Sequence, residues 1–518
     1  MTSFELLKLL GNAQDEYIMD SRKRPKQPQK PPILKLAALA ACAAILVGLG
    51  GTMLYLKPWT SGSSAPTNAP ETLSSPAPGG ENDSTAEDLP ENSANPIETD
   101  GITLLSAAQS PAMPKTSEER SKAWQENQVS EDTSYALSAF AYQVSEDTSY
   151  ALSAFAYQLG PQVLANTDDS VCFSPVSLYQ VLSVITSGAG GTTQEQLLSL
   201  LGQGDVDTLK SEMQKLYQVN QQDTETDHLE FAGSLWLDEK QQDGENQVGF
   251  HPDWVMQAAM DYYCDVYAAD FSSGAANAPV AAWINQHTGG LMANRLEDFS
   301  MSPNTVMAAV NTVYYHSQWV EPFTETAQGT FTAQDGTQTT CDFMQRSDLF
   351  GEAVVTERYT KSYLQLSAGK MCVVLPKEGV DLDELLSEDT LWEIFEDGSY
   401  QNAQVEWSVP KFTTDTDLDL KDALTAAGVT DAFHGDAADF SAIADTPLYL
   451  SSVIQGTHIA VNEDGIEAAS YTAIGMEAGA GDSDEAPVVE MNLNRPFLYL
   501  VTASDGSPLF FGVVRNVE

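Results

Sequence analysis

The chain has 518 residues, with 74 Asp or Glu against 24 Lys or Arg, and carries a formal net charge of -50. Its hydrophobic fraction of 42% is enough to bury a sizeable core in one large or two to three ordinary domains. The acidic excess argues against nucleic acid or heparin as a partner, because such polyanions bind clusters of Lys and Arg. Five scattered cysteines without a CxxC pair predict neither a disulfide-stapled scaffold nor a zinc site.

The N-terminal region combines a short basic stretch with a long apolar run over residues 33–56. As a helix rising about 1.5 Å per residue, this run can cross a hydrocarbon core of about 30 Å. A secretory signal is the alternative, but the polar segment before the run is long and the run exceeds the apolar part of a signal peptide. We therefore expect a single transmembrane helix at 33–56. Because positive charge stays inside, residues 1–32 are expected in the cytoplasm and the rest of the chain outside the cell. The basic residues of the stretch are Arg22, Lys23, Arg24, Lys26 and Lys30.

Residues 57–120 consist largely of Ser, Thr, Pro, Asn, Gly and Glu. Such a segment cannot bury enough apolar surface to offset its ordering entropy, so we expect a disordered stalk over 57–120 and a folded domain over 121–518. Within that domain, residues 129–143 are repeated letter for letter at 144–158. Both copies could extend one amphipathic helix. We favour a recent tandem duplication in which only the second copy is packed.

The sequence contains no recognisable catalytic motif. Its six histidines form no HExxH pair, and no GxSxG elbow, Walker loop or GxGxxG follows a strand pattern. His287 and His316 are interpreted as structural residues, and Cys172, Cys341 and Cys372 as small buried apolar residues. We therefore expect no enzyme activity, no cofactor and no metal site.

The first strong local pattern lies at residues 170–201. A short apolar strand runs into a helix that has Pro175 in its first turn and ends at the glycines of 188–191. The next helix is expected to be capped by Thr192 or Thr193 together with Glu195.

Two further patterns follow in the middle of the chain. Residues 283–299 predict a helix that is broken at the Gly289-Gly290 pair. Residues 307–323 form an apolar run that ends in aromatic side chains, which predicts a buried strand.

Seven blocks of sequence, taken in chain order, resemble the corresponding blocks of the serpin family, and the resemblance covers roughly Ser134–Glu518. It implies an α+β serpin fold, with helices around a five-stranded sheet A, two further sheets and an exposed reactive loop. It also implies suicide inhibition of serine proteases. The protease cleaves the loop, the loop inserts into sheet A as an extra strand, and the covalent acyl-enzyme is distorted before it hydrolyses. The blocks are FSPVSL, WINQHTGG, AVNTVYYHSQWVEPF, VPKF, ADFSAI, VNEDGIEAAS and RPFLYL.

The resemblance also implies roles for individual residues. Trp319 and an ion pair between Glu463 and Lys411 would mark the place where the loop first inserts. A polar cluster beneath the opening strands would carry Gln455 where the family usually has histidine. The other members of that cluster would be Ser174, Ser177 and Asn311. The hinge of the loop would consist of Glu463, Gly465, Ile466, Glu467, Ala468, Ala469 and Ser470.

The alternation of side chains along a strand tests whether this loop can insert. If Ile466 faces the core, every second residue up to Met476 is apolar or small, and Glu467 faces outward. Continuing the alternation turns Asp482 and Asp484 inward, and burying unpaired carboxylates is strongly unfavourable. Insertion should therefore stop before Asp482.

Two features favour slower insertion or none. Ile466 stands where inhibitory members usually carry Thr or another small residue, and the loop is longer than usual. Counting from the hinge places the scissile bond at Gly479–Ala480, whereas counting back from Pro496 places it near Glu485. Because the alternation supports the first count, we predict cleavage at Gly479–Ala480.

Small residues at the cleavage point suit elastase-like or subtilisin-like serine proteases, since no Lys or Arg occurs from 462 to 494. We interpret the chain as a monomeric, membrane-anchored inhibitor on a bacterial cell surface, with serine proteases as its partners and no heparin-binding helix. The alternative is a non-inhibitory serpin that acts as a surface binding protein or chaperone. A surface enzyme or sensor is a third hypothesis, which the missing catalytic motifs disfavour.

Overall fold

The structure is a computed structural model. Within the residues it describes, no helix combines the length and the apolar character needed to cross a bilayer. The predicted segments 1–32 and 33–56 and the first copy of the repeat lie outside those residues. The described residues are 102–110, 113, 150–165, 167–224, 226–238, 250–293, 299–397, 399–445, 447–466 and 486–517.

The first sheet, here called sheet A, contains eight strands among the described residues. Five of them form its body in the order β5-β4-β6-β13-β12, in keeping with the five-stranded sheet that the resemblance implies. Three short strands are added: β1 at the edge beside β5, β3 beside β4, and β14 between β6 and β13. The bounds are β1 Ile102–Ser106, β3 Gln222–Asp223, β4 Asp227–Asp238, β5 Cys264–Ala269, β6 Met307–Gln318, β12 Phe412–Asp419, β13 Ser452–Val461 and β14 Gly465–Ile466.

The second sheet has nine strands among the described residues, in the order β15-β11-β8-β9-β10-β16-β17-β2, with β7 beside β8. The resemblance implies two separate sheets here, but the structure joins them. The 18-residue strand β8 is long enough to pair with β11 along most of its length and with β9 at its end. The bounds are β2 Val171–Phe173, β7 Glu325–Thr332, β8 Gln338–Val355, β9 Tyr359–Leu366, β10 Gly369–Pro376, β11 Gln401–Pro410, β15 Val488–Asn492, β16 Phe497–Ala503 and β17 Pro508–Val514.

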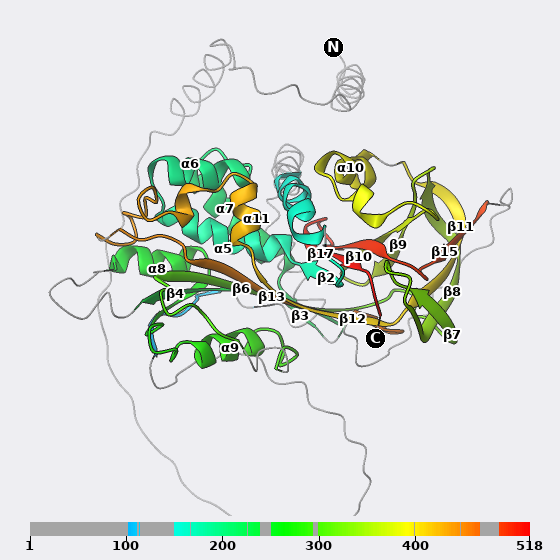
Figure 1. The fold of residues 1–518 in the computed structure, drawn as a ribbon, viewed down its shortest axis with the longest axis horizontal. Coiled ribbons are helices and arrows are strands. Elements are labelled where there is room, and N and C mark those ends of the chain that lie inside the picture. The colour runs from blue at the N-terminus through cyan, green and yellow to red at the C-terminus, as the bar shows by residue number, and fades with distance from the viewer. Residues whose placement is uncertain are drawn as a thin grey trace, which may run out of the picture. The chain divides into compact units, whose positions relative to one another are not determined.

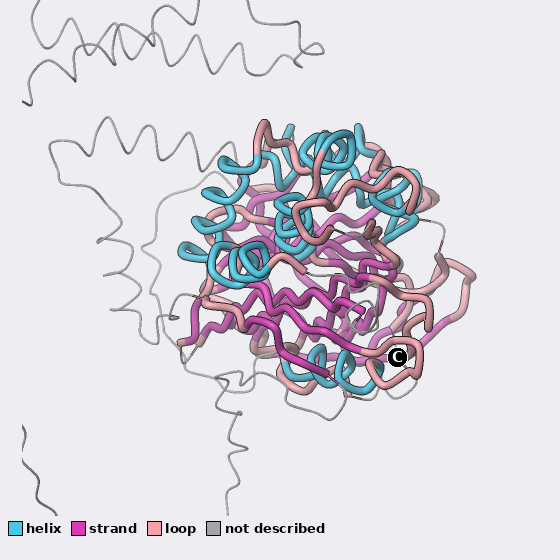
Figure 2. The backbone as a smooth tube through the Cα atoms, turned by 90° about the vertical axis from the view of Figure 1, so that its left-hand side faces the viewer, coloured by secondary structure: helices cyan, strands magenta, loops and turns pink. Residues whose placement is uncertain are grey.

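Helices cover both faces of sheet A. Figures 1 and 2 show α5, α6, α7 and α11 on one side of the strands and α9 on the other. The larger apolar core lies on the α5 side, and a second cluster that includes Trp236 and Trp283 lies under α9. Residues 150–164 are also helical. The bounds are α5 Pro175–Gly188, α6 Gly191–Leu200, α7 Val206–Asn220, α8 Pro252–Asp261, α9 Asn277–Gln286, α10 Glu388–Trp392 and α11 Lys421–Ala426, with shorter turns η3 Leu382–Leu385, η4 Glu393–Asp397 and η5 Asp431–Phe433.

The helix α5 begins and ends as the sequence predicts. Ser174 occupies the N-cap, where its hydroxyl accepts a hydrogen bond of 3.3 Å from the backbone N–H of Ser177. Pro175 fits the first turn because that turn needs no backbone donor. Nearly every residue of α5 is buried, so this helix forms the centre of the larger core.

The predicted cap of α6 is wrong. The helix begins at Gly191 behind Gly190, and no side chain caps it. The threonine hydroxyls are used in tertiary contacts instead. Thr192 donates to the Asp431 carboxylate at 2.7 Å, and Thr193 accepts from the backbone N–H of Asp439 at 3.0 Å.

The predicted helix over 283–299 ends earlier than expected, at Gln286. Gly289 and Gly290 both have positive φ angles, which a helix cannot continue through. At Gly289 a Cβ atom would lie 3.0 Å from the Tyr314 ring, so this turn packs closely on β6. The predicted buried strand is confirmed as β6.

The strand β1 lies inside the segment whose composition predicts a disordered stalk. It pairs antiparallel with β5, with Ile102 opposite Ala269 and Leu104 opposite Tyr267. Ile102 and Leu104 pack against the core cluster under α9. An edge strand needs few apolar residues of its own, because most of its order comes from the strand it joins. Residues 102–106 are therefore part of sheet A, upstream of the expected domain start at 121.

Candidate functional site

The candidate site is the seam between β6 and β13 in sheet A (Figure 1). The two strands pair in parallel over Ala308–Thr312 and Ser452–Gly456. Towards their C-terminal ends, β14 lies between them and pairs with both. Between these two zones lie residues 313–316 of β6 and 457–460 of β13, which belong neither to the β6–β13 ladder nor to the pairing with β14. The seam is thus closed by direct pairing at one end and separated by β14 at the other.

The register of the seam is the same in both zones. Ala308 pairs with Ser452 in the parallel ladder. Nine residues further along each strand, Ser317 and Val461 both pair with Ile466 of β14. A strand that continued from β14 would therefore separate β6 from β13 sideways, without sliding one along the other.

A tight turn places β14 at the end of the seam where β6 and β13 are separated, here called the mouth of the seam. The Asn462 side-chain oxygen accepts hydrogen bonds from the backbone N–H groups of Asp464 at 2.9 Å and Gly465 at 3.1 Å. Gly465 lies so close to β6 that a Cβ atom would be 2.1 Å from the Ser317 carbonyl oxygen. Only glycine fits there. The sequence interpretation missed Asn462, although an Asn three residues before a Gly is a signal of such a turn.

Aromatic residues hold this turn against the end of β6. Trp319 is buried, and its indole N–H donates to the Asn462 carbonyl at 2.9 Å. The backbone N–H of Trp319 donates to the Asp464 carbonyl at 2.8 Å, and that of Phe323 donates to the Glu463 carbonyl at 3.0 Å. The two aromatic rings pack edge to face, with centroids 6.2 Å apart. The backbone carbonyls of Asn462, Glu463 and Asp464 are therefore each bonded to the segment that follows β6.

The ion pair between Glu463 and Lys411, which the resemblance implies, is present. The Glu463 carboxylate also accepts a hydrogen bond of 3.4 Å from Thr326. Partial burial alone would raise the pKa of Glu463, but the hydrogen bond and charge of Lys411 outweigh it, so the pKa lies below its usual value. Glu463 therefore remains ionised and paired at neutral pH.

A buried polar cluster closes the other end of the seam. Asn311 of β6 and Gln455 of β13 are direct partners in the parallel ladder. The Asn311 side-chain oxygen accepts from Gln455 at 2.6 Å and from the Ser177 hydroxyl at 2.9 Å. Gln455 accepts from the backbone N–H of Ser174 at 2.7 Å and donates to the Ser174 carbonyl at 3.0 Å. All four residues are fully buried.

Each side-chain nitrogen and oxygen atom of the two amides has a hydrogen-bond partner. The Asn311 amide nitrogen donates to the Ile454 carbonyl at 3.3 Å, so Asn311 binds β13 through both its nitrogen and its oxygen. Gln455 joins β13 to the start of α5. Opening the seam here would break several buried hydrogen bonds at once. We call this cluster of Ser174, Ser177, Asn311 and Gln455 the latch of the seam.

The structure brings together the predicted residues in two groups. At the mouth lie Glu463, Gly465, Ile466, Trp319 and Lys411. The latch consists of Ser174, Ser177, Asn311 and Gln455. The other predicted residues, Glu467, Ala468, Ala469, Ser470, Gly479 and Ala480, lie outside the described residues and stay predictions.

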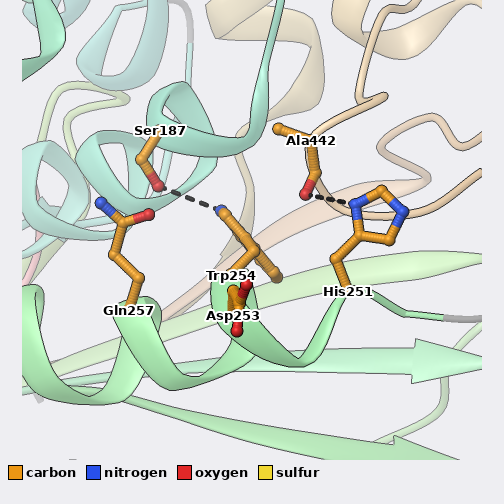
Figure 3. Close-up of a pocket in the computed structure, with 6 residues that line it drawn as sticks. All are labelled: Ser187, His251, Asp253, Trp254, Gln257 and Ala442. Carbon is orange, nitrogen blue, oxygen red and sulfur yellow. Dashed lines mark hydrogen bonds between the residues drawn. The ribbon is translucent and has the colours of Figure 1, made fainter.

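A separate surface hollow of about 350 Å³ lies where the end of α5 meets α8. Figure 3 shows the Trp254 indole donating to the Ser187 hydroxyl, at 3.1 Å, and the His251 ring beside the Ala442 carbonyl, at 3.0 Å. None of its lining residues belongs to β6, β13 or β14, so it is not part of the seam. The lining residues are Ser187, His251, Asp253, Trp254, Gln257 and Ala442.

The sequence matches a family model described as Serpin (serine protease inhibitor) over residues 150–517. Among curated relatives, human Serpin B11 is 28% identical over 380 residues, which are 67% of this chain and 93% of the relative. The Leukocyte elastase inhibitor of Xenopus tropicalis is 28% identical over 363 residues, covering 67% of this chain and 93% of the relative.

Solved structures show the same fold. The thermophilic serpin tengpin in its native state gives a TM-score of 0.62 at 20% identity, covering 80% of this chain and all of tengpin. Human thyroxine-binding globulin, solved in complex with thyroxine, also gives a TM-score of 0.62, at 23% identity, covering 72% of this chain and 99% of the globulin.

The latch predicts that Asn311→Ala destabilises the protein. The change removes the bond to the Ile454 carbonyl and leaves one N–H of Gln455 unpaired in a buried site, and such a group costs about 1–3 kcal/mol. Urea unfolding followed by circular dichroism should show a lower midpoint for Asn311→Ala and an unchanged midpoint for Asn304→Ala, whose side chain is exposed. An unshifted Asn311→Ala midpoint would contradict the latch.

Proposed function

The chain belongs to the serpin family, and from that premise we propose that it traps serine proteases by inserting its cleaved reactive loop into the seam of sheet A. The observation that carries this proposal is β14. It is the start of the loop, and it already lies between β6 and β13 with Ile466 fully buried. A strand that begins inside a sheet can extend along the seam without a new nucleation step.

The register of β14 indicates what each following residue would meet. Ile466 pairs antiparallel with Ser317, so if the pairing continued, Ala468 would lie beside Tyr315, which is buried in the larger core. Glu467 would lie beside His316, which is only half-buried. Small apolar residues would thus enter the core while the charged residue stays at the outer face, in keeping with the alternation of the sequence.

The length of β6 supports a cleavage site at Gly479–Ala480. If the seam opened along its whole length, Met476 would meet Met307, the first residue of β6. The inserted strand would then end a few residues before Gly479. A site near Glu485 would require a longer strand than β6 can pair with, besides burying Asp482.

Ala and Gly around that bond suit a protease with a shallow apolar primary pocket. Elastase-like or subtilisin-like enzymes are therefore the proposed targets, and the name of the Xenopus relative, Leukocyte elastase inhibitor, supports the same class. We further propose that residues 33–56 anchor the inhibitor in a bacterial cell membrane with the serpin domain outside, as the charge pattern favours.

A non-inhibitory binding protein is the second candidate. Thyroxine-binding globulin, whose fold this chain shares, is named for binding a small molecule. Ile466 and the long acidic loop are the two features of the sequence that favour this alternative, and the structure describes the first of them. Its side chain is already accommodated in the core, where it packs without exposure, so it offers no barrier to the first step of insertion.

The proposal predicts a covalent complex with elastase but not with trypsin. Incubation with pancreatic elastase should give a band that survives SDS, because the acyl-enzyme is trapped before hydrolysis. Mass spectrometry should find a released peptide that begins at Ala480. Preferential trapping of trypsin would contradict the proposed specificity, and cleavage without any complex would favour the non-inhibitory candidate.

The register also predicts that an arginine introduced at position 468 blocks insertion, whereas an arginine at the neighbouring position 467 does not. Ala468→Arg would place a guanidinium in the core beside Tyr315, and burying an unpaired charge is too costly for insertion to proceed. This variant should be cleaved as a substrate and lose nearly all complex formation. The matched Glu467→Arg variant places the same charge at the outer face and should keep most of it. Equal loss in both variants would show that the register is wrong.

A further inference from the structure

Two of the most exposed large apolar side chains of the described residues are adjacent on β8. Leu349 is 60% exposed and Phe350 is 69% exposed. On either side of them, Asp348 pairs with Val405 and Gly351 pairs with Ala403, so that both residues face one position of β11. This arrangement is a β-bulge, which turns consecutive side chains out of the regular alternation. The bulge is thus what puts both apolar side chains into solvent.

A third exposed apolar residue lies on the neighbouring strand. The β11 residue opposite the bulge is Gln404, and its partner on the other side is Val488 of β15, which is 61% exposed. Leu349, Phe350 and Val488 therefore flank Gln404 on the outer face of the sheet, and we call these three the apolar row. Large apolar side chains that gather at one exposed place mark a binding surface more often than single scattered ones do.

The surface beside the apolar row is acidic. Glu406 and Glu490 are paired across β11 and β15 in the next outward-facing position. Within β8, β11 and β15 the single basic residue is Arg346, whose side chain is 11% exposed and contacts Asp348 at 3.4 Å. A partner for this surface would combine an apolar contact with surrounding Lys or Arg.

The apolar row adjoins the place where the reactive loop returns to the sheet. The backbone N–H of Gln404 donates to the Pro487 carbonyl at 3.0 Å, and Val488 follows at once. The seven residues between Ala480 and Val488 span at most about 25 Å when extended. A protease of roughly 230 residues has a radius of gyration of about 17 Å, so an enzyme holding the scissile bond would reach this surface.

We propose that the apolar row is an accessory docking surface for the target protease. The inference rests on the proposed function and adds a partner surface to it. The row receives the part of the enzyme that lies beyond the leaving side of its active site. The matching surface of that enzyme is apolar and ringed by basic residues, so docking weakens as salt screens the surrounding charges.

The test uses the full chain and pancreatic elastase whose catalytic serine is replaced by alanine, which can bind the loop but cannot cleave it. The Leu349→Ser/Phe350→Ser double variant should weaken the dissociation constant about tenfold, the loss expected when a contact worth roughly 1.4 kcal/mol is removed. The control Met256→Ser, at a 52% exposed apolar residue on α8, should leave it unchanged. All three proteins should unfold at the same temperature, since the substituted side chains are largely in solvent.

Equal dissociation constants for the wild type and the double variant would overturn the proposal. A wild-type dimer that the double variant converts to a monomer would also overturn it, because the row would then belong to a second copy of the chain. A weakened constant, together with no SDS-stable complex between the wild type and active elastase, would uphold the docking surface and contradict only the proposed inhibition.

Discussion

The parallel pairing of Asn311 with Gln455 is the interaction on which the rest of the seam depends. It closes β6 onto β13 at one end of sheet A, while β14 already separates them at the other end. Because both amides are buried and hydrogen-bonded, neither can leave its partner without leaving a buried polar group unpaired. The closed end therefore resists opening as a unit, so it would open in a single step rather than gradually.

The observed arrangement and the proposed inserted one would use the same backbone groups. In the observed state β6 and β13 bond to each other over five residue pairs. An inserted strand would bond to both of them along the whole seam, and would bury its small apolar residues in the core that contains Ile466 and Tyr315. The matching registers at the two ends mean that the exchange needs separation but no sliding. The latch must therefore open before a strand can extend from β14 along the whole seam.

Local chemistry made part of this architecture predictable from sequence. The Ser174-Pro175 pair predicts the start of a helix, because proline fits its first turn, and the apolar run of residues 307–323 predicts the buried strand β6. Features that arise from distant partners were not predictable. The Thr192 hydroxyl binds Asp431 instead of capping its own helix, and β1 becomes a strand because β5 offers a free edge. The bulge at Leu349 depends on its register with β11, which the sequence of β8 does not contain.

The most direct measurement of the central claim is hydrogen exchange in the middle of the seam, before and after a protease cuts the loop. Residues 313–316 of β6 and 457–460 of β13 lie between the β6–β13 ladder and the pairing with β14. If the cleaved loop inserts between them, their seam-facing amides become part of a continuous ladder and their exchange slows by orders of magnitude. Unchanged exchange in these two segments after complete cleavage would contradict the account, because no strand would have been added between β6 and β13.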